Sequence, residues 1–316
     1  MTARKAGSLL LLLMGALLFQ GWGFSVHRQV HRAAVHALPV PLQGWFEREV
    51  DWLAEHAVDA DKRKHRVERE APRHYLDLDA PALSCLDMLR PVPTWSEAVA
   101  SCTEDTLWAY GVLPWNVDWS YRRLVQAFHE QNREAILRAA SDLGHYVGDT
   151  HVPLHTTLNY NGQLTGQKGI HALWETRLPE LFGAEYFLAA PEPIWIPNVL
   201  AWTWARIQES HAAVYSVLRL EREAVAAWSG DLVVREQRGR VVQQQQVVSW
   251  CREYHDQLDG MVERRWRASI HGVASLWWSA WVEAGQPNLE GVLGANPPCS
   301  VWRRWRKKCP PLEGNP

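Results

Sequence analysis

The sequence lacks the motifs that identify several common classes of enzyme. It contains no Gly-x-Ser-x-Gly motif, no glycine-rich loop that would cradle a phosphate and no dinucleotide-binding fingerprint. Its five cysteines include no Cys-x-x-Cys pair, which argues against a zinc site made of thiolates. The net charge of −2 provides no overall attraction to nucleic acid. Any metal chemistry must therefore come from histidines and carboxylates.

Long apolar runs are also missing after residue 21, so no later segment is expected to cross a bilayer. The first 21 residues place Arg4 and Lys5 ahead of the apolar run from Leu9 to Phe19, which is the layout of a secretory signal peptide. We predict that residues 1–21 are such a signal and that the protein is exported, either secreted or periplasmic. Phe19 is bulky where a small residue is usual before cleavage, so an uncleaved membrane anchor is the alternative.

Tryptophan is the aromatic residue in excess, with 19 copies against six phenylalanines. Indole rings mostly serve as large core residues whose N–H groups need a hydrogen-bond acceptor. With 316 residues and 47% apolar content, the chain can bury a large core in one domain or in two closely packed ones. In an oxidising compartment Cys85 with Cys102 and Cys299 with Cys309 are the nearest disulfide candidates, and Cys251 is expected to be a buried thiol.

The spacing of apolar residues predicts an all-α protein. Intervals of three and four residues favour helices over about 26–38, 42–58, 95–111, 117–151, 198–228 and 244–284. No run alternates convincingly as a β-strand does. We expect a helical domain over residues 22–285, followed at 286–316 by a tail rich in Pro and Gly. The basic and aromatic segment from Trp302 to Lys308 in this tail is expected to be poorly ordered, with binding of phosphates or anionic lipid head groups as the alternative.

Potential metal ligands are concentrated near the middle of the chain. His145 and Asp149, like His171 and Glu175, are four positions apart, which on a helix places both side chains on one face. Pro153 should break the first of these helices, so that His155 lies beyond the break. Histidine nitrogen and carboxylate oxygen are zinc ligands, and a site with an open coordination position can be catalytic. The pattern therefore predicts a zinc cluster.

Further candidate ligands lie in the N-terminal half. His27 and His74 are imidazoles, and Asp59 is a carboxylate fifteen residues before His74. Asp61 competes with Asp59, and we favour Asp59 for that distance. Trp22 would begin the mature chain if the signal were cleaved after Gly21, and a free α-amino group is itself a nitrogen ligand.

In this order the residues resemble a known superfamily, formed by the zinc-dependent phospholipases C of bacteria and the single-strand nucleases of the S-one/P-one type. The resemblance extends from Trp22 to about Leu181. It implies a single large all-α domain built around a trinuclear zinc cluster. Three zinc ions would then be held by nine residues: one by Trp22 and His27, one by Asp59, His74 and His145, and one by His155, His171 and Glu175, with Asp149 bridging the first two.

The resemblance also suggests two catalytic residues. Lys62, three residues after Asp59, falls where the nucleases have a basic residue that meets phosphate, and a solvated surface lysine is the alternative. Asp77, three residues after His74, falls where they have an acidic residue near the attacking water. The implied reaction is hydrolysis of a phosphodiester by metal-bound hydroxide.

The substrate remains open between the two branches. Glu175, in place of Asp, and the short segment between His155 and His171 are similar to the phospholipases, whereas the Trp22–His27 and Asp59–His74 spacings are similar to the nucleases. We expect a phospholipase C-like hydrolase that releases a phospholipid head group, with possible membrane-surface contact and no protein partner. The alternatives are a single-strand nuclease and a non-catalytic helical protein stabilised by metal.

Overall fold

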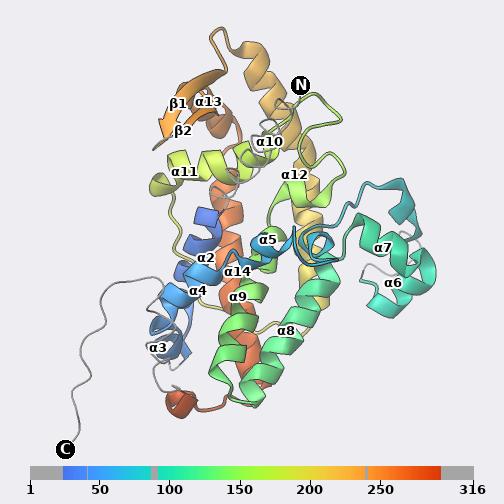
Figure 1. Ribbon diagram of the computed structural model, residues 1–316, viewed down its shortest axis with the longest axis vertical. Coiled ribbons are helices and arrows are strands. Elements are labelled where there is room, and N and C mark those ends of the chain that lie inside the picture. Colours follow the sequence, from blue (N-terminus) through green and yellow to red (C-terminus); the bar gives the residue numbers. More distant parts are fainter. Residues whose placement is uncertain (1–23, 41, 87–91, 239–240, 293–316) are drawn as a thin grey trace, which may run out of the picture.

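The computed structural model describes residues 24–40, 42–86, 92–238 and 241–292, and these are mostly helical. Four long helices form the frame of the molecule: α8 (Leu113–His129), α9 (Arg133–Asp149), α12 (Val199–Ala227) and α14 (Met261–Glu283). α8, α9 and α14 pack on one another, and α12 lies against α8 (Figure 1). The prediction of an all-α fold is confirmed.

Shorter elements surround this frame. The N-terminal part contributes α2 (Phe24–Ala37), α3 (Leu42–Glu47), α4 (Val50–His56), α5 (Asp59–Arg63), η1 (Ala71–His74), η2 (Pro81–Leu86), α6 (Trp95–Cys102) and α7 (Glu104–Tyr110). After α9 come η3 (Pro153–Thr156), α10 (Ile170–Ala172), η4 (Leu173–Arg177), α11 (Leu178–Phe182), η5 (Gly183–Glu185), β1 (Val233–Arg238), β2 (Val241–Gln246), α13 (Val248–Gln257) and η6 (Glu290–Val292).

Two clusters of buried apolar side chains hold these elements together. The larger one lies among α2, α8, α9 and α14 and includes the fully buried Trp115 and Trp277. The smaller one joins α11, α12 and α13 around Phe182, Trp250 and Tyr254. Burial of such large side chains is the dominant favourable contribution to folding.

The expectation that buried indole N–H groups find a hydrogen-bond acceptor holds for only some of the tryptophans. The indole N–H groups of Trp115 and Trp277 donate to the carbonyls of Pro93 and Ala140, at 3.0 and 2.9 Å. Among the described residues, however, five buried indole nitrogens have no hydrogen-bond partner: those of Trp45, Trp174, Trp204, Trp250 and Trp266.

Several predicted helices are in fact pairs of helices joined by tight turns. α6 and α7 meet at Thr103, α8 and α9 at Gln131, and α13 and α14 at Gly260, and each of these residues has a positive φ. A new helix, α9, begins after the turn at Gln131 because the side chain of Asn132 caps it by accepting a hydrogen bond from the N–H of Ala135. The apolar period continues across each turn, so periodicity alone does not locate it.

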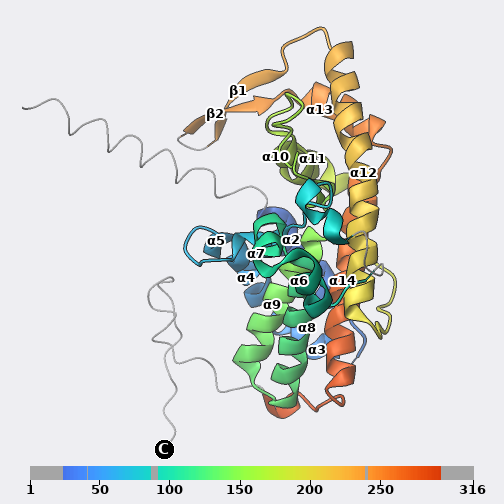
Figure 2. The same cartoon turned by 90° about the vertical axis from the view of Figure 1, so that its right-hand side faces the viewer.

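The structure also contains one antiparallel hairpin, β1 paired with β2, that the sequence analysis did not predict. It follows α12 and projects from one end of the molecule (Figure 2). Its register pairs Val233 with Gln246 and Arg238 with Val241. Both strands begin with two adjacent valines and continue with polar residues, so neither shows the alternation that marks a half-buried strand.

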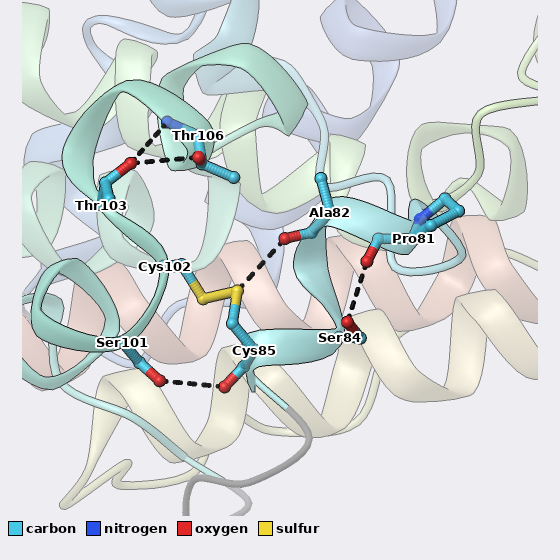
Figure 3. Close-up of a disulfide and its surroundings, with 8 residues drawn as sticks. All are labelled: Pro81, Ala82, Ser84, Cys85, Ser101, Cys102, Thr103 and Thr106. Atoms are coloured by element: carbon cyan, nitrogen blue, oxygen red, sulfur yellow. Dashed lines mark hydrogen bonds between the residues drawn. A yellow bond between two sulfur atoms is a disulfide. The ribbon is translucent and has the colours of Figure 1, made fainter.

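The expected pairing of Cys85 with Cys102 is confirmed. These residues form a disulfide that ties η2 to the end of α6 (Figure 3). Cys251 is fully buried, as expected. Cys299 and Cys309 lie outside the described residues, as do the predicted signal at 1–21 and most of the tail, including the segment from Trp302 to Lys308.

Loss of this disulfide should lower stability measurably. The bond closes a loop between cysteines 17 positions apart. Closing a loop of that size stabilises by about 3 kcal/mol, mainly by restricting the unfolded chain. In Cys85→Ser we expect a fall of about 10 °C in Tm, measured by circular dichroism. Dithiothreitol should shift the wild type toward the variant, and equal Tm values for oxidised wild type and variant would contradict the prediction.

Membrane-spanning segments were also sought among the helices of the described ranges. None of these helices combines the length and the apolar character needed to cross a bilayer.

Candidate metal centre

Three groups of side chains in the structure are arranged so that each could hold a metal ion. They are His27, His145 and Asp149; Asp61, His74 and His145; and His155, His171 and Glu175. Within each group the potential ligand atoms lie within 4.8 Å of one another. Histidine nitrogen and carboxylate oxygen are the donors that zinc accepts. The structure thus brings together eight residues from α2, α5, η1, α9, η3, α10 and η4.

α9 supplies the two residues at the centre of the first two groups. His145 and Asp149 are both buried near its C-terminal end and lie on one face, as predicted. Nδ1 of His145 lies 2.8 Å from the carbonyl oxygen of Ala57, which requires a proton on Nδ1. Nε2 therefore keeps its lone pair and points toward the Asp149 and Asp61 carboxylates, at 3.4 and 3.7 Å. A carbonyl behind a histidine fixes its tautomer for metal binding.

His74 enters the same space from η1. Its Nδ1 lies 2.9 Å from Oδ2 of Asp149 and 3.1 Å from Nε2 of His145. Its Nε2 is buried and lies 3.8 Å from the carboxylate of Glu70. Glu70 also accepts hydrogen bonds from the hydroxyl of Tyr146 and from Arg63. Glu70 was not predicted as part of the site, although it precedes His74 by four positions.

The third group adjoins the first through Glu175. Oε2 of Glu175 lies 2.7 Å from Nε2 of His171 and 3.6 Å from Nε2 of His155, while Oε1 lies 3.8 Å from Nε2 of His27. Nδ1 of His155 and Nδ1 of His171 face the carbonyls of His74 and Tyr160. His155 follows the break at Pro153, as expected, and Glu175 lies in the π-helical turn η4, a feature often found at functional sites.

Gly148 allows His27 to reach this centre. A Cβ atom at Gly148 would lie 3.0 Å from Cε1 and 3.1 Å from Nδ1 of the His27 ring, closer than ordinary contact. His27 stacks on His145 with ring centroids 4.1 Å apart. The absence of a side chain at Gly148 therefore lets α2 pack closely against α9.

The electrostatics of the centre favour a bound cation. Burial lowers the pKa of His74, His145 and His155, so these imidazoles are neutral at neutral pH, as metal binding requires. Burial, together with the charges of Asp61 and Glu175, raises the pKa of Asp149 well above its usual range. Burial also opposes the charges of Asp61 and Glu175, but neighbouring histidines, with Lys64 beside Asp61, outweigh it and lower the pKa of both carboxyls. A bound cation would therefore stabilise the ionised form of Asp149.

Buried histidine nitrogens without a hydrogen-bond partner test independently whether the site suits a metal ion. Among the described residues, Nδ1 of His27, Nε2 of His74 and Nε2 of His155 are buried without a hydrogen-bond partner. Buried polar groups are almost always satisfied. An ion bound by Nε2 of His155 would satisfy that atom, so the residues present fit a metal.

The structure places Asp61, and not Asp59, beside His74 and His145. The carboxylate of Asp59 is exposed and contacts Lys62 at 2.7 Å. The two aspartates are two positions apart on α5, which turns their side chains about 200° from each other, so only one can face the centre. The sequence distance to His74 could not reveal this, and the preference for Asp59 is replaced by Asp61.

The predicted lysine, like the predicted aspartate, is replaced by the residue two positions later. Lys62 points to the surface with Asp59, whereas Nζ of Lys64 lies 2.6 Å from Oδ1 of Asp61. Burial opposes the charge of Lys64, but Asp61, Asp149 and Glu175 outweigh it and raise its pKa. Lys64 keeps the interval of three residues from the aspartate and contacts a member of the centre directly.

Asp77 and Trp22 complete the predicted set. Asp77 is buried, and burial together with the neighbouring Asp79 raises its pKa to about 7. It lies outside the three groups, three residues after His74. Trp22 lies outside the described residues, so its predicted role stays a prediction.

Asp61 and Asp59 form a matched pair for testing the centre. We expect Asp61→Asn to bind at least one metal ion fewer than the wild type, because a neutral amide is a poor ligand and the group of Asp61, His74 and His145 would lose its own carboxylate. Asp59→Asn should keep the full metal content. Metal per protein, measured by inductively coupled plasma mass spectrometry, checks both variants. The opposite ranking would restore Asp59 as the ligand.

Comparison with known proteins does not assign the chain to a family. No protein-family model matches the chain, and no curated protein is significantly similar to it.

Proposed function

We propose that this protein is a zinc-dependent phosphodiester hydrolase. The observation that carries the proposal is the set of three adjoining histidine and carboxylate groups, of which two share His145 and the third approaches His27 through Glu175. A structural zinc site usually closes around one ion with four ligands, whereas this arrangement could hold ions side by side. Adjacent ions are the typical arrangement for hydrolysis of phosphate esters.

The residues of the centre would have different roles in the hydrolysis. We infer three zinc ions, held by the three groups, with Trp22 as a further ligand. His145 offers only Nε2 and would therefore bind one ion, while the Asp149 carboxylate would join the two groups that contain His145. Bound zinc would lower the pKa of water to about 7 and neutralise phosphate charge. Lys64, rather than Lys62, would place its ammonium against a phosphate oxygen. Asp77, with its pKa raised to about 7 by burial, would accept a proton and orient the attacking water.

Hydrolysis by the purified, zinc-loaded protein tests this proposal. Bis(p-nitrophenyl) phosphate reports phosphodiester cleavage without regard to the rest of the substrate. Phosphatidylcholine vesicles and single-stranded DNA and RNA then separate a phospholipase C from a nuclease. Cleavage that a chelator abolishes supports the proposal.

A metal-stabilised protein without catalysis is the competing function. In that case none of these substrates would be cleaved, while the chelator would still lower Tm, because metal bound only by the folded state stabilises that state. If a fully metal-loaded protein cleaved none of these substrates, the proposal would therefore be overturned.

A further inference from the structure

A small cavity adjoins the candidate metal centre where α2, α9, η4, α11 and α14 meet. Its volume is about 40 Å³. Two members of the centre, His27 and Glu175, form part of its wall. Much of the remaining wall is aliphatic and includes Val30, Pro179 and Val262. Whatever occupies this cavity therefore lies against the centre from within the protein.

Four residues of the wall carry a buried nitrogen that has no hydrogen-bond partner among the described residues. These atoms are Nδ1 of His27, Nε2 of His151 and Nε1 of both Trp174 and Trp266. Each of the four side chains belongs to a residue that is at most 5% exposed. Gly148 also lines the cavity, and a Cβ atom there would lie 3.1 Å from Nδ1 of His27, so this nitrogen is at the wall. Because buried polar groups are almost always satisfied, four such atoms around one cavity indicate a shared hydrogen-bonding ligand.

The tautomers of the two histidines decide which of these nitrogens donate. Nδ1 of His151 lies 2.8 Å from the carbonyl oxygen of Val147, so Nδ1 carries the proton and Nε2 is an acceptor. Nε2 of His27 faces the carboxylates of Asp149 and Glu175, at 3.6 and 3.8 Å. With a metal ion on that nitrogen the ring proton is on Nδ1, which becomes a donor. Indole nitrogens only donate. The ligand of the cavity must therefore both accept and donate hydrogen bonds.

His27 differs from the other histidines of the centre in what lies behind its ring. A histidine that binds a metal almost always donates its second N–H to an outer partner. A backbone carbonyl faces Nδ1 in three members of the centre, His145, His155 and His171. Within the described ranges no such carbonyl faces Nδ1 of His27. Its outer partner must then be reached through the cavity, where Nε2 of His151 is an unused acceptor.

We propose that the cavity binds water, and that a water molecule there links Nδ1 of His27 to Nε2 of His151. The volume has room for about three water molecules. The linking water would accept from His27 and donate to His151. The hydroxyl of Ser269, which itself donates to the carbonyl of Trp266, offers a second acceptor. His151 is thus a positioning residue that holds a metal ligand through water, and the inference rests on the proposed function for its zinc ions alone.

Other occupants fit the cavity less well. An anion would lie against the carboxylate of Glu175, and a cation would meet three N–H donors. The guanidinium of Arg265 also lines the cavity, but it already donates to the carbonyls of His151 and Arg206, at 2.9 and 3.2 Å. An apolar molecule would leave all four nitrogens unpaired, which is costly. Water alone among these both donates and accepts.

A crystal structure of the zinc-loaded protein tests the ligand directly. We expect an ordered water molecule at about 2.7–3.2 Å from both Nδ1 of His27 and Nε2 of His151. A dry cavity, an ion in the cavity or direct contact between the two rings would overturn the inference.

Substitution of His151 tests its role in positioning His27. His151→Leu removes the acceptor with little change in volume, whereas the amide oxygen of His151→Gln can take the place of Nε2. Competition with a chromophoric chelator measures the affinity for each zinc ion. In His151→Leu we expect one ion to bind about tenfold or more weakly, the usual effect of losing an outer partner, while the others bind as in the wild type. His151→Gln should keep most of the affinity.

His255→Leu is the matched control, because the side chain of His255 is only 12% exposed but lies outside the cavity. It should bind zinc as the wild type does. Equal affinities in His151→Leu and His255→Leu would contradict the link through water. Equal weakening of every ion in His151→Leu would also contradict it, since that is the effect of a general loss of packing. None of these measurements requires catalysis, so a protein that binds zinc and holds the water but cleaves no phosphodiester would reject the proposed function and keep this inference.

Discussion

Asp149→Asn should leave a folded protein that has lost bound metal and retains about 1% or less of the wild-type hydrolytic rate. Oδ1 of Asp149 lies 3.6 Å from His27, and Oδ2 lies 2.9 and 3.4 Å from His74 and His145. This carboxylate thus faces ligands of two groups. Asparagine has the same shape, but its amide is neutral and presents two N–H donors where ligand lone pairs converge. Losing preorganised charge stabilisation commonly costs about 10²- to 10³-fold in rate.

Metal content by mass spectrometry and hydrolysis of bis(p-nitrophenyl) phosphate would be measured together. Glu134→Gln is the control, because Glu134 is an exposed carboxylate on the same helix that pairs with Arg138. It should behave as the wild type. A helical circular dichroism spectrum in Asp149→Asn separates loss of metal from loss of fold. Normal metal content and activity in this variant would refute the bridging position of Asp149.

Trp277→Ala should lower the free energy of unfolding by about 3–5 kcal/mol. Trp277 is fully buried on α14, donates its N–H to the carbonyl of Ala140, and stacks on Phe46 with ring centroids 5.0 Å apart. It also meets the His31 ring edge-on at 5.6 Å. Removing the indole leaves a cavity and an unpaired carbonyl where α2, α3, α9 and α14 meet.

Urea unfolding of the metal-loaded protein measures this loss. Trp278→Ala is the control, since it removes the same side chain from the next position of α14, where it is only partly buried. We expect it to cost clearly less than Trp277→Ala. Equal losses from the two variants would show that Trp277 does not have the central packing role that its burial indicates.

Features that depend on local spacing were predictable from the sequence. The interval from His145 to Asp149 places both on one helix face, as observed, and His155 lies beyond the end of that helix, which comes at Asp149, ahead of Pro153. The Cys85–Cys102 pairing followed from proximity along the chain. In each case one short segment determines the geometry.

Features that depend on orientation or tertiary contact were not predictable in the same way. Asp59 and Asp61 are equally good ligands by type, and only the rotation of α5 against α9 selects Asp61. Glu70 becomes part of the centre through contacts with His74 and Tyr146 from distant elements. The hairpin of β1 and β2 escaped because its pattern is mostly polar, and strand pairing rather than periodicity defines it.

The distribution of the ligands along the chain also bears on how the protein folds. His27 belongs to the first described helix, whereas Glu175 lies beyond α9, and their side chains come within 3.8 Å. The centre can therefore form only after a large loop has closed, and contacts between residues distant in sequence form slowly. A bound metal ion would hold the two ends of that loop together. Refolding in the presence of zinc would then report the late assembly of the metal centre.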